Sequence, residues 1–444
     1  MQHIVIIGNG IAGITAARHI RKLGNDKISV ISGETDHFFS RTALMYIFMG
    51  HMKYEHTKPY EDWFWKKNKI ELIKGWVKTV NFEGKLLQFE SGETLSYDKL
   101  IIATGSKSNK FGWPGEDLNG VQGLYSYQDL ESMETNTKGI SHAVVVGGGL
   151  IGIEMVEMLH SRHIPVTFLV REDSFWDMFL PPEESGMINN HIREYGIDLR
   201  LNTEVEEIIN DGTGNVKAIK TKSAEIISCE FLGLTVGVSP NIDFLKDSKL
   251  EVDKGVLVDD YLKTNIDDVY AIGDCAQIKN PMSHRKPIEA VWYTGRMMGE
   301  TLAQTIAGKD TKYQPGIWFN SAKFFDIEYQ VYGEIEPIPS KDVDSIYWEA
   351  PNGKNGIRIA FDKSKNTLKG MNAMGIRFRH NVWNDWIASG ARIKDVVANL
   401  QTSFFDPEFS IPVDREIQKI FNQKFPDDQI TAKKKSFLEK ILSL

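Results

Sequence analysis

The chain has 444 residues, of which 41% are hydrophobic and 25% charged, and such values are typical of a globular protein with several domains. Its net charge of −8 provides no broad basic surface, so we expect no nucleic-acid partner. The two cysteines, Cys229 and Cys275, form no CxxC pair, which excludes a thiolate zinc site and a dithiol redox centre.

The first predicted element is a buried strand at residues 3–7, which runs into a glycine-rich turn and then a helix over Ile14–Leu23. In the pattern GxGxxG, Gly8 allows the tight turn, Gly10 lets a pyrophosphate approach the backbone, and Gly13 lets the helix pack closely on the strand. The helix N-terminus then faces the anion. A turn that serves packing alone is the alternative, but the strand, turn and helix together favour a dinucleotide site at Gly8, Gly10, Ala12 and Gly13.

The next strand is predicted at Lys27–Ser32. In dinucleotide sites, an acid near the end of this strand binds the ribose hydroxyls of the adenosine. Glu34 is the available acid, although it stands two positions later than the usual place. We therefore assign Glu34 to the adenosine ribose of the first nucleotide.

The same pattern returns in the middle of the chain. A strand at residues 143–147 leads into a second glycine-rich turn, a helix to about residue 163, and a strand at Val166–Val170. One nucleotide needs only one such fingerprint, so two of them imply two dinucleotides. The second site is predicted at Gly147, Gly149 and Gly152.

The residues after this last strand bear on the choice between NADH and NADPH. Arg171 would neutralise a 2′-phosphate, whereas Glu172 would hold a 2′-hydroxyl. An exposed pair of these two side chains without a ligand is the alternative. The pair favours NADPH slightly, and we assign Arg171 as a contact of the second nucleotide.

Further segments resemble the pyridine nucleotide-disulfide oxidoreductase superfamily, and in particular its ferredoxin, rubredoxin and nitrite reductase-type flavoproteins. Residues 101–105 resemble the strand that closes the first half of the FAD site, and residues 235–241 resemble the return from the pyridine-nucleotide domain. Residues 271–274 resemble the second FAD motif, whose aspartate accepts a hydrogen bond from the ribityl chain. The resemblance extends over residues 1 to about 310 and implies cofactor contacts at Val77, Ala103, Thr104, Gly105, Gly237, Gly273 and Asp274.

The resemblance implies an α/β protein with two Rossmann-like, three-layer ββα dinucleotide-binding domains and a C-terminal α+β domain. The FAD-binding domain would be split between residues 1–114 and 245–312, with the NAD(P)-binding domain inserted at 115–244. Residues 313–444 would form the C-terminal α+β interface domain. In that domain we expect strands and one helix at Ser345–Glu349, Gly356–Phe361, Leu368–Met374 and Val382–Leu400.

One segment departs from the disulfide-reducing members of the family. Where those enzymes carry one or two cysteines over the flavin, this chain has Arg41, so a thiolate or disulfide mechanism has no sulfur atom there. The resemblance implies that Arg41 faces the FAD phosphates, and a surface ion pair is the alternative. Many relatives place a lysine five residues later, paired with the glutamate of the second turn near flavin N5. Here these positions are Tyr46 and Glu154, so either Tyr46 donates a hydrogen bond or the N5 environment differs.

Two residues further along the chain are also assigned by resemblance. Glu289 resembles a glutamate beside the flavin pyrimidine, and a helix N-terminal acid is the alternative. Trp318 would approach the flavin, and packing at a domain junction is the alternative. With Glu154 and Tyr46, Trp318 completes the group of residues that we expect around the reaction.

The implied reaction is hydride transfer from NAD(P)H to FAD, followed by transfer of electrons to an acceptor, for which a small redox protein such as a ferredoxin or rubredoxin is expected. One alternative is a quinone or oxygen reductase held at the membrane surface by residues 433–444, where apolar residues follow a basic cluster. Another is an NAD(P)H-sensing interaction flavoprotein. A homodimer is left open.

The start of the chain lacks a basic leader, and no run of about twenty apolar residues occurs, so we expect no secretory signal and a cytoplasmic location. His160 and His163 lie at helical spacing but have no carboxylate partner nearby in sequence. We therefore expect no metal site.

Overall fold

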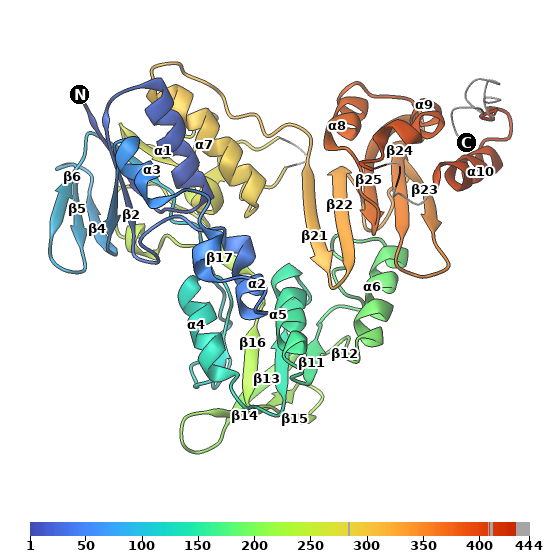
Figure 1. Cartoon of the computed structure of the whole chain (residues 1–444), viewed down its shortest axis with the longest axis horizontal. Coiled ribbons are helices and arrows are strands. Elements are labelled where there is room, and N and C mark those ends of the chain that lie inside the picture. Colours follow the sequence, from blue (N-terminus) through green and yellow to red (C-terminus); the bar gives the residue numbers. More distant parts are fainter. Residues whose placement is uncertain (283–284, 407, 409–411, 432–444) are drawn as a thin grey trace. The chain divides into compact units, whose positions relative to one another are not determined.

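A computed structural model describes residues 1–282, 285–406, 408 and 412–431. The chain forms two compact units. The first contains residues Met1–Trp176 and Ile192–Gly316, and the second contains Asp177–His191 together with the chain that follows Gly316. Both glycine-rich turns therefore belong to the first unit (Figure 1).

A five-stranded parallel sheet of order β19-β7-β1-β2-β3 carries the N-terminal glycine turn. Ile4 and Ile6 of β1 are fully buried, as expected for a strand that is covered on both faces. Helices α1 and α7 pack side by side, and a Cβ added at Gly299 of α7 would lie 2.7 Å from the carbonyl oxygen of Ala12. The elements are β1 (His3–Ile7), β2 (Lys27–Ser32), β3 (Ile70–Lys74), β7 (Lys99–Ile102), β19 (Val269–Ala271), α1 (Ile11–Leu23) and α7 (Trp292–Ile306).

An antiparallel sheet of order β4-β5-β6 supplies a further layer to this half of the first unit. Leu87 and Phe89 of β5 join the hydrophobic core that contains β1 and α1. The strands are β4 (Val77–Asn81), β5 (Leu86–Phe89) and β6 (Thr94–Ser96). The short helices α2 (Leu44–Phe48) and α3 (Asp62–Lys67) lie between β2 and β3 in the chain.

A second parallel sheet, of order β12-β11-β10-β16-β9, repeats this plan around the second glycine turn. The antiparallel strands β13-β14-β15 accompany it, as β4-β5-β6 accompany the first sheet. Its elements are β9 (Val121–Gln122), β10 (Ala143–Val146), β11 (Val166–Leu169), β12 (Asp198–Arg200), β13 (Val205–Asn210), β14 (Val216–Thr221), β15 (Ile226–Ser228), β16 (Phe231–Leu234), α4 (Tyr127–Asn136) and α5 (Leu150–Ser161).

Two pairs of short strands complete the first unit. β8 pairs antiparallel with β17 where the chain enters and later leaves the second sheet, and β18 pairs parallel with β20. These strands are β8 (Ser106–Ser108), β17 (Val238–Pro240), β18 (Val256–Val258) and β20 (Ala276–Ile278). The expected α/β fold class with two Rossmann-like parts is thus confirmed.

The second unit is built on a five-stranded antiparallel sheet of order β21-β22-β25-β24-β23. Trp383 of α8 is fully buried in its core. The elements are β21 (Phe319–Phe324), β22 (Ile327–Gly333), β23 (Val343–Glu349), β24 (Gly356–Asp362), β25 (Thr367–Met374), α8 (His380–Ala388), α9 (Ile393–Ala398) and α10 (Asp414–Lys424). The three expected strands of this part are present.

Two features of the second unit differ from the sequence expectations. The expected single helix over 382–400 is wrong, because α8 ends at Ala388 and Gly390, with a φ of 62°, turns the chain before α9 begins. Residues 177–191, expected within a continuous NAD(P)-binding domain, instead pack with the second unit. This segment contains most of α6 (Pro182–Glu194), whose Glu184 is buried against Arg358 of β24.

Among the helices of the described residues, none has the length and apolar character that crossing a bilayer requires.

Candidate cofactor site

A cavity of about 940 Å³ opens at the carboxyl ends of β1, β2 and β7 in the first unit. This is the place where open parallel sheets bind nucleotides. The predicted site residues that line it are Gly8, Gly10, Ala12, Glu34, Arg41, Val77, Ala103, Thr104, Gly105, Glu154, Gly273 and Asp274. Segments that are spread over the first 300 positions of the chain thus meet in one cavity.

In the first glycine turn, each glycine is required for a different structural reason. Gly8 has a φ of +116°, and an added Cβ would lie 2.0 Å from the carbonyl oxygen of Ala103. At Gly13 an added Cβ would lie 2.1 Å from the carbonyl oxygen of Gly8, so this glycine lets α1 pack on the turn. Gly10 has no atom within 4 Å of an added Cβ, and it lines the cavity. The space in front of Gly10 therefore suits the close approach of a phosphate.

The second glycine turn has the same geometry. Gly147 has a φ of +117°, and its added Cβ would lie 2.4 Å from the carbonyl oxygen of Thr235. At Gly152 an added Cβ would lie 2.1 Å from the carbonyl oxygen of Gly147, whereas Gly149 again has open space. Nearby, Gly237 accepts a hydrogen bond of 3.0 Å at its carbonyl oxygen from the backbone N–H of Asn109. The second glycine turn thus has the same backbone geometry as the first, which suits a second dinucleotide.

Glu34 and Arg41 form a two-armed ion pair at the edge of the first cavity. The Arg41 Nη1 and Nη2 atoms donate to the Glu34 carboxylate at 2.8 and 2.5 Å, and the guanidinium lies 4.6 Å from the ring centre of Tyr125. Burial works to lower the pKa of Arg41, but the hydrogen bonds and charge of Glu34 raise it above its ordinary value. The carboxylate also accepts from the backbone N–H of Tyr127 at 2.9 Å. The two residues expected at the ribose and the phosphates therefore contact each other directly.

Trp76 is a site residue that the sequence patterns did not single out. It lines the cavity next to Val77, one of the residues that the resemblance assigns to the FAD site, and the residue is 51% exposed. An added Cβ at Gly33 would lie 2.0 Å from the indole, so only glycine at position 33 lets the ring lie against β2. The signal in the sequence that could have pointed to Trp76 is Gly33, the glycine directly before Glu34.

Asp274 follows β19 and lies in the same cavity. Its carboxylate accepts hydrogen bonds of 3.2 Å from the Ser106 hydroxyl and from the Tyr125 hydroxyl. Burial raises the pKa of Asp274 above its ordinary value, although these two donors act in the opposite direction. The carboxylate is therefore held by two neutral hydroxyl groups at the position assigned to the ribityl chain.

Glu154 belongs to α5, the helix that follows the second glycine turn, and also lines the first cavity, as does Met45 of α2. Burial, together with the charge of Glu157, raises the pKa of Glu154 to about 7. Within the described part of the chain, Glu154 has no ion-pair partner. Tyr46, at the position of the expected lysine, does not line this cavity, and its ring stacks on His51 at 6.1 Å. The structure thus brings Glu154, but not Tyr46, to the cavity.

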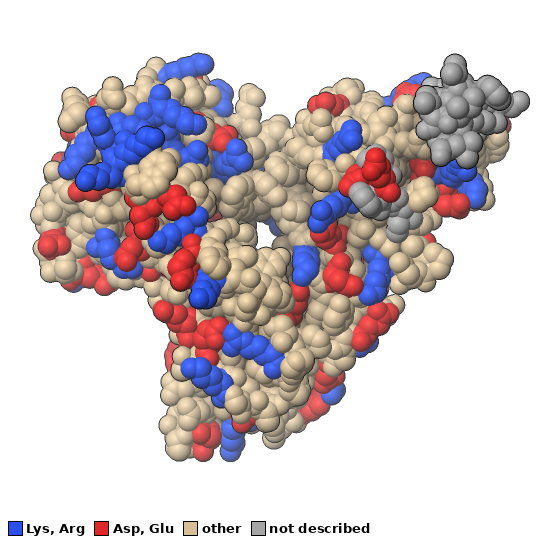
Figure 2. Space-filling view, in the orientation of Figure 1, with Lys and Arg blue, Asp and Glu red and all other residues tan. Residues whose placement is uncertain are grey.

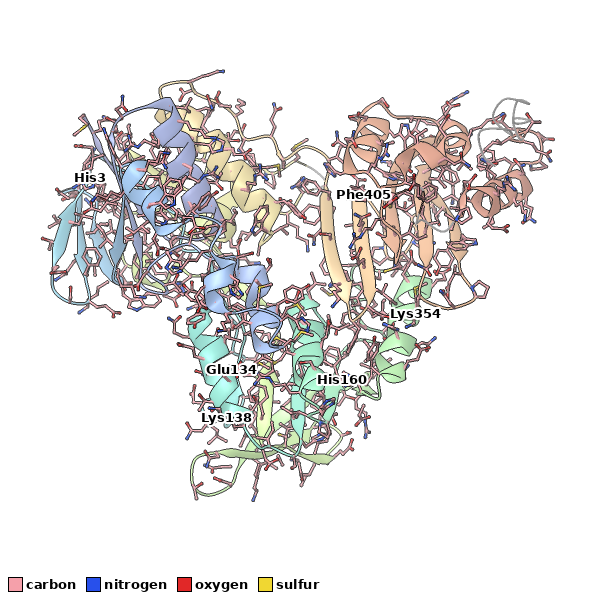
Figure 3. All side chains as sticks on the ribbon, in the orientation of Figure 1. His3, Glu134, Lys138, His160, Lys354 and Phe405 are labelled. Carbon is pink, nitrogen blue, oxygen red and sulfur yellow. The ribbon has the colours of Figure 1, made fainter. Side chains whose placement is uncertain are left out.

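The helix that carries Glu154 is tied to its neighbours at its far end. Arg162, which follows α5, pairs with Glu134 of α4 at 2.5 Å and donates from Nε to the carbonyl oxygen of Phe48 at 3.0 Å. Figure 3 labels Glu134 on α4 and His160 in the last turn of α5. These contacts fix α5 against α2 and α4, and thereby fix the place of Glu154.

Three assigned residues lie elsewhere. Arg171 is exposed and pairs with Glu172 at 2.8 Å beyond the end of β11. Glu289 is buried in an ion pair with Arg285 beside a second cavity of about 440 Å³, and its neighbour Ala290 lines the first cavity. Trp318 belongs to the second unit, directly before β21. The cofactor roles of these residues stay predictions.

No cluster of three or more potential metal ligands occurs among the residues that the structure describes. His163 stands after α5 with a φ of 59°, outside the helix that the spacing suggested.

Comparison with known proteins agrees with this geometry. A family model described as pyridine nucleotide-disulphide oxidoreductase matches residues 2–299. The chain is 26% identical over 353 residues to nitrite reductase (NAD(P)H) of Bacillus subtilis, covering 78% of this chain but only 43% of that enzyme. It is 28% identical over 337 residues to NADH-rubredoxin oxidoreductase of Clostridium acetobutylicum, covering 75% of this chain and 82% of that enzyme. A ferredoxin reductase from Rhodopseudomonas palustris has the same fold, with a TM-score of 0.78, 19% identity and coverage of 94% and 99% of the two chains.

Proposed function

Because the chain belongs to the pyridine nucleotide-disulphide oxidoreductase family and is an FAD-dependent NAD(P)H oxidoreductase, we propose that its electron acceptor is a small redox protein of the ferredoxin or rubredoxin type. The bound flavin supplies the chemistry that accepts a hydride and releases electrons. The residues of the chain bind and orient the two cofactors and set the charge around the flavin.

The observation that carries this proposal is the absence of a thiol from the cavity that fits FAD. The wall formed by Arg41, Thr42, Leu44 and Met45 contains no cysteine. Neither cysteine of the chain lines the cavity, because Cys229 and Cys275 are both buried as free thiols, the latter directly behind the cavity residue Asp274. Burial raises the pKa of both thiols, that of Cys229 to about 12. Electrons that reach the flavin therefore have no sulfur relay in this protein and pass directly to an outside acceptor.

The placement of α5 supports the first half of the reaction. Ile151 and Glu154, which follow the second glycine turn, line the cavity of the first. A nucleotide bound at the second turn therefore lies beside the same helix that borders the flavin cavity. This arrangement suits the stacking of a nicotinamide on the flavin, which hydride transfer requires.

The cavity residues also suit FAD itself. The open space before Gly10 would receive the pyrophosphate, and Asp274 would accept a hydrogen bond from the ribityl chain. Arg41 would turn one arm from Glu34 to a phosphate oxygen or hold the acid in place for the ribose. We place the reaction in the cytoplasm, since both cysteines are free thiols. Membrane attachment through residues 433–444 lies outside the described residues.

The test is an anaerobic titration of the purified, yellow protein with NADH and with NADPH, monitored in the visible spectrum. Bleaching by either nucleotide is expected, and reoxidation should be much faster with ferredoxin or rubredoxin than with quinone or oxygen. If quinone or oxygen restores the colour fastest, the acceptor proposal fails. If no acceptor restores it and the nucleotide instead changes the oligomeric state, the protein is a sensor.

A further inference from the structure

The C-terminal half of α1 and the end of α3 present their cations on one shared surface. Arg21 of α1 donates from Nη2 to the carbonyl oxygen of Lys69 at 3.0 Å. The guanidinium of Arg18 lies 4.8 Å from the ring centre of Tyr60, which precedes α3. Figure 2 shows Lys and Arg side chains gathered over this region of the first unit. We call Arg18, Lys22, Lys66, Lys67 and Lys69 the α1–α3 cationic surface.

The members of this surface lack acidic partners. In the described part of the chain, none of the five forms an ion pair, whereas the nearby Lys58 pairs with Asp62 and Lys27 with Glu71. The acids of α3, Glu61 and Asp62, stand at its N-terminal end, opposite the lysines. Soluble proteins usually intersperse charges of both signs. A chain with a net charge of −8 therefore carries a local surface of the opposite sign.

An exposed aromatic side chain lies within the same surface. The Trp63 side chain is 59% exposed, and Lys67 Nζ lies 5.0 Å from its ring centre. Beneath it, Phe64 stacks on Tyr60 at 4.5 Å and packs edge-on against the buried Trp65 at 5.2 Å. These ring contacts anchor α3 to its neighbours, whereas Trp63 stays largely exposed. Lysine beside exposed tryptophan is the combination that favours the boundary between lipid headgroups and acyl chains.

We propose that the α1–α3 cationic surface attaches the protein to anionic phospholipid membranes. Each cation close to such a surface adds to the attraction, and the tryptophan ring enters the headgroup layer.

The position of the α1–α3 cationic surface favours a role in membrane attachment over a role in docking an electron acceptor. Helix α1 starts at the glycine turn of the FAD cavity, and its 13 residues span about 20 Å. Lys22 and the adjoining α3 lysines stand at the opposite end of that helix. An acidic redox protein docked there would be separated by about this length from the glycine turn that lines the cavity. The surface therefore suits a partner that needs no electrons from it.

The test is sedimentation of the full-length holoprotein with vesicles of phosphatidylcholine, with and without phosphatidylglycerol, at low and high salt. The protein is expected to bind only the anionic vesicles and to leave them at high salt. The triple variant Lys22→Gln, Lys66→Gln, Lys67→Gln should bind about 100-fold more weakly, because each charge near the membrane contributes roughly fivefold. Its flavin spectrum and bleaching by NAD(P)H should be unchanged, which shows that the fold is intact.

Two further variants serve as controls for the vesicle-binding test. Lys138→Gln, Lys217→Gln, Lys254→Gln removes three exposed lysines elsewhere on the first unit, with Lys138 at the end of α4 in Figure 3, and should bind like the natural protein. Replacing the three lysines 433–435 by glutamine tests the C-terminal sequence. The proposal is overturned if anionic and neutral vesicles bind alike, if no vesicle binds, or if only the 433–435 variant loses binding. It is also overturned if the α1–α3 variant loses ferredoxin reduction instead of vesicle binding, which would make this surface a protein docking site.

Discussion

Glu154 shows how the surroundings of one side chain change the chemistry that the sequence motif alone would suggest. Burial and the charge of Glu157 raise its pKa to about 7, so both protonation states are populated near neutral pH. A hydride brings negative charge into the flavin, and a carboxylate beside the cavity opposes it. We therefore expect the rate of flavin bleaching by NAD(P)H to fall as the pH rises through about 7, by about tenfold, since a unit charge several ångströms away contributes ~1.4 kcal/mol or more.

Stopped-flow bleaching between pH 5.5 and 8.5 measures this effect. In Glu154→Gln the step near pH 7 should be absent, and the rate should stay near the low-pH value. Glu157→Gln is the matched variant, because loss of its charge should lower the pKa of Glu154 and shift the step to lower pH. A step that survives unchanged in Glu154→Gln would assign it to another group.

Also at the residue scale, Arg171 is predicted to favour NADPH over NADH. It is 67% exposed and pairs only with its neighbour Glu172 in the described residues, so its guanidinium is free to turn to a 2′-phosphate. Arg171→Ala should raise the KM for NADPH about 10-fold and leave that for NADH unchanged. Arg200→Ala, which removes another exposed, paired arginine of the same sheet, should change neither. Equal losses with both nucleotides would show that Arg171 does not read the 2′ position.

At the scale of elements, the glycine turn between β1 and α1 separates a folding role from a binding role. Gly10 has an ordinary φ of −69° and open space, so Gly10→Ala should leave the stability of the apoprotein within about 0.5 kcal/mol while it blocks the phosphate and releases FAD. Gly13→Ala should lower the free energy of unfolding by about 1–3 kcal/mol, because its Cβ meets the carbonyl oxygen of Gly8. Chemical denaturation of the apoproteins and FAD reconstitution measure the two effects. Equal loss of stability in both variants would contradict this division.

At the scale of the whole molecule, one buried ion pair joins segments far apart in the chain. Arg358 of β24 donates from Nε to Glu184 at 2.7 Å, and the two side chains are 7% and 1% exposed. Burial raises the pKa of Glu184 even though Arg358 acts to lower it. Arg358→Met leaves the carboxylate without its partner and should lower the unfolding free energy of the second unit by about 3–5 kcal/mol.

Calorimetry and chemical denaturation check this value. The double variant with Glu184→Met should recover most of the loss, since no uncompensated charge then remains buried. Arg377→Met, which removes an exposed pair with Glu328, should cost about 1 kcal/mol or less. A double variant as unstable as Arg358→Met alone would show that packing, and not charge, is what the arginine provides.

The sequence by itself determined the two dinucleotide turns, the parallel sheets around them and the pair of cofactors, because each turn depends on contiguous residues. The positive φ of Gly8 and the close approach of Gly13 to the carbonyl oxygen of Gly8 are requirements that arise within six positions, and such local requirements are legible without the fold. The contact between Gly8 and the carbonyl oxygen of Ala103, in contrast, is created by the fold. Only the tertiary structure decided which side chains meet. It joined Glu34 to Arg41 and separated Tyr46 from the cavity. It also moved residues 177–191 to the second unit, because such contacts depend on burial and charge that distant segments create together.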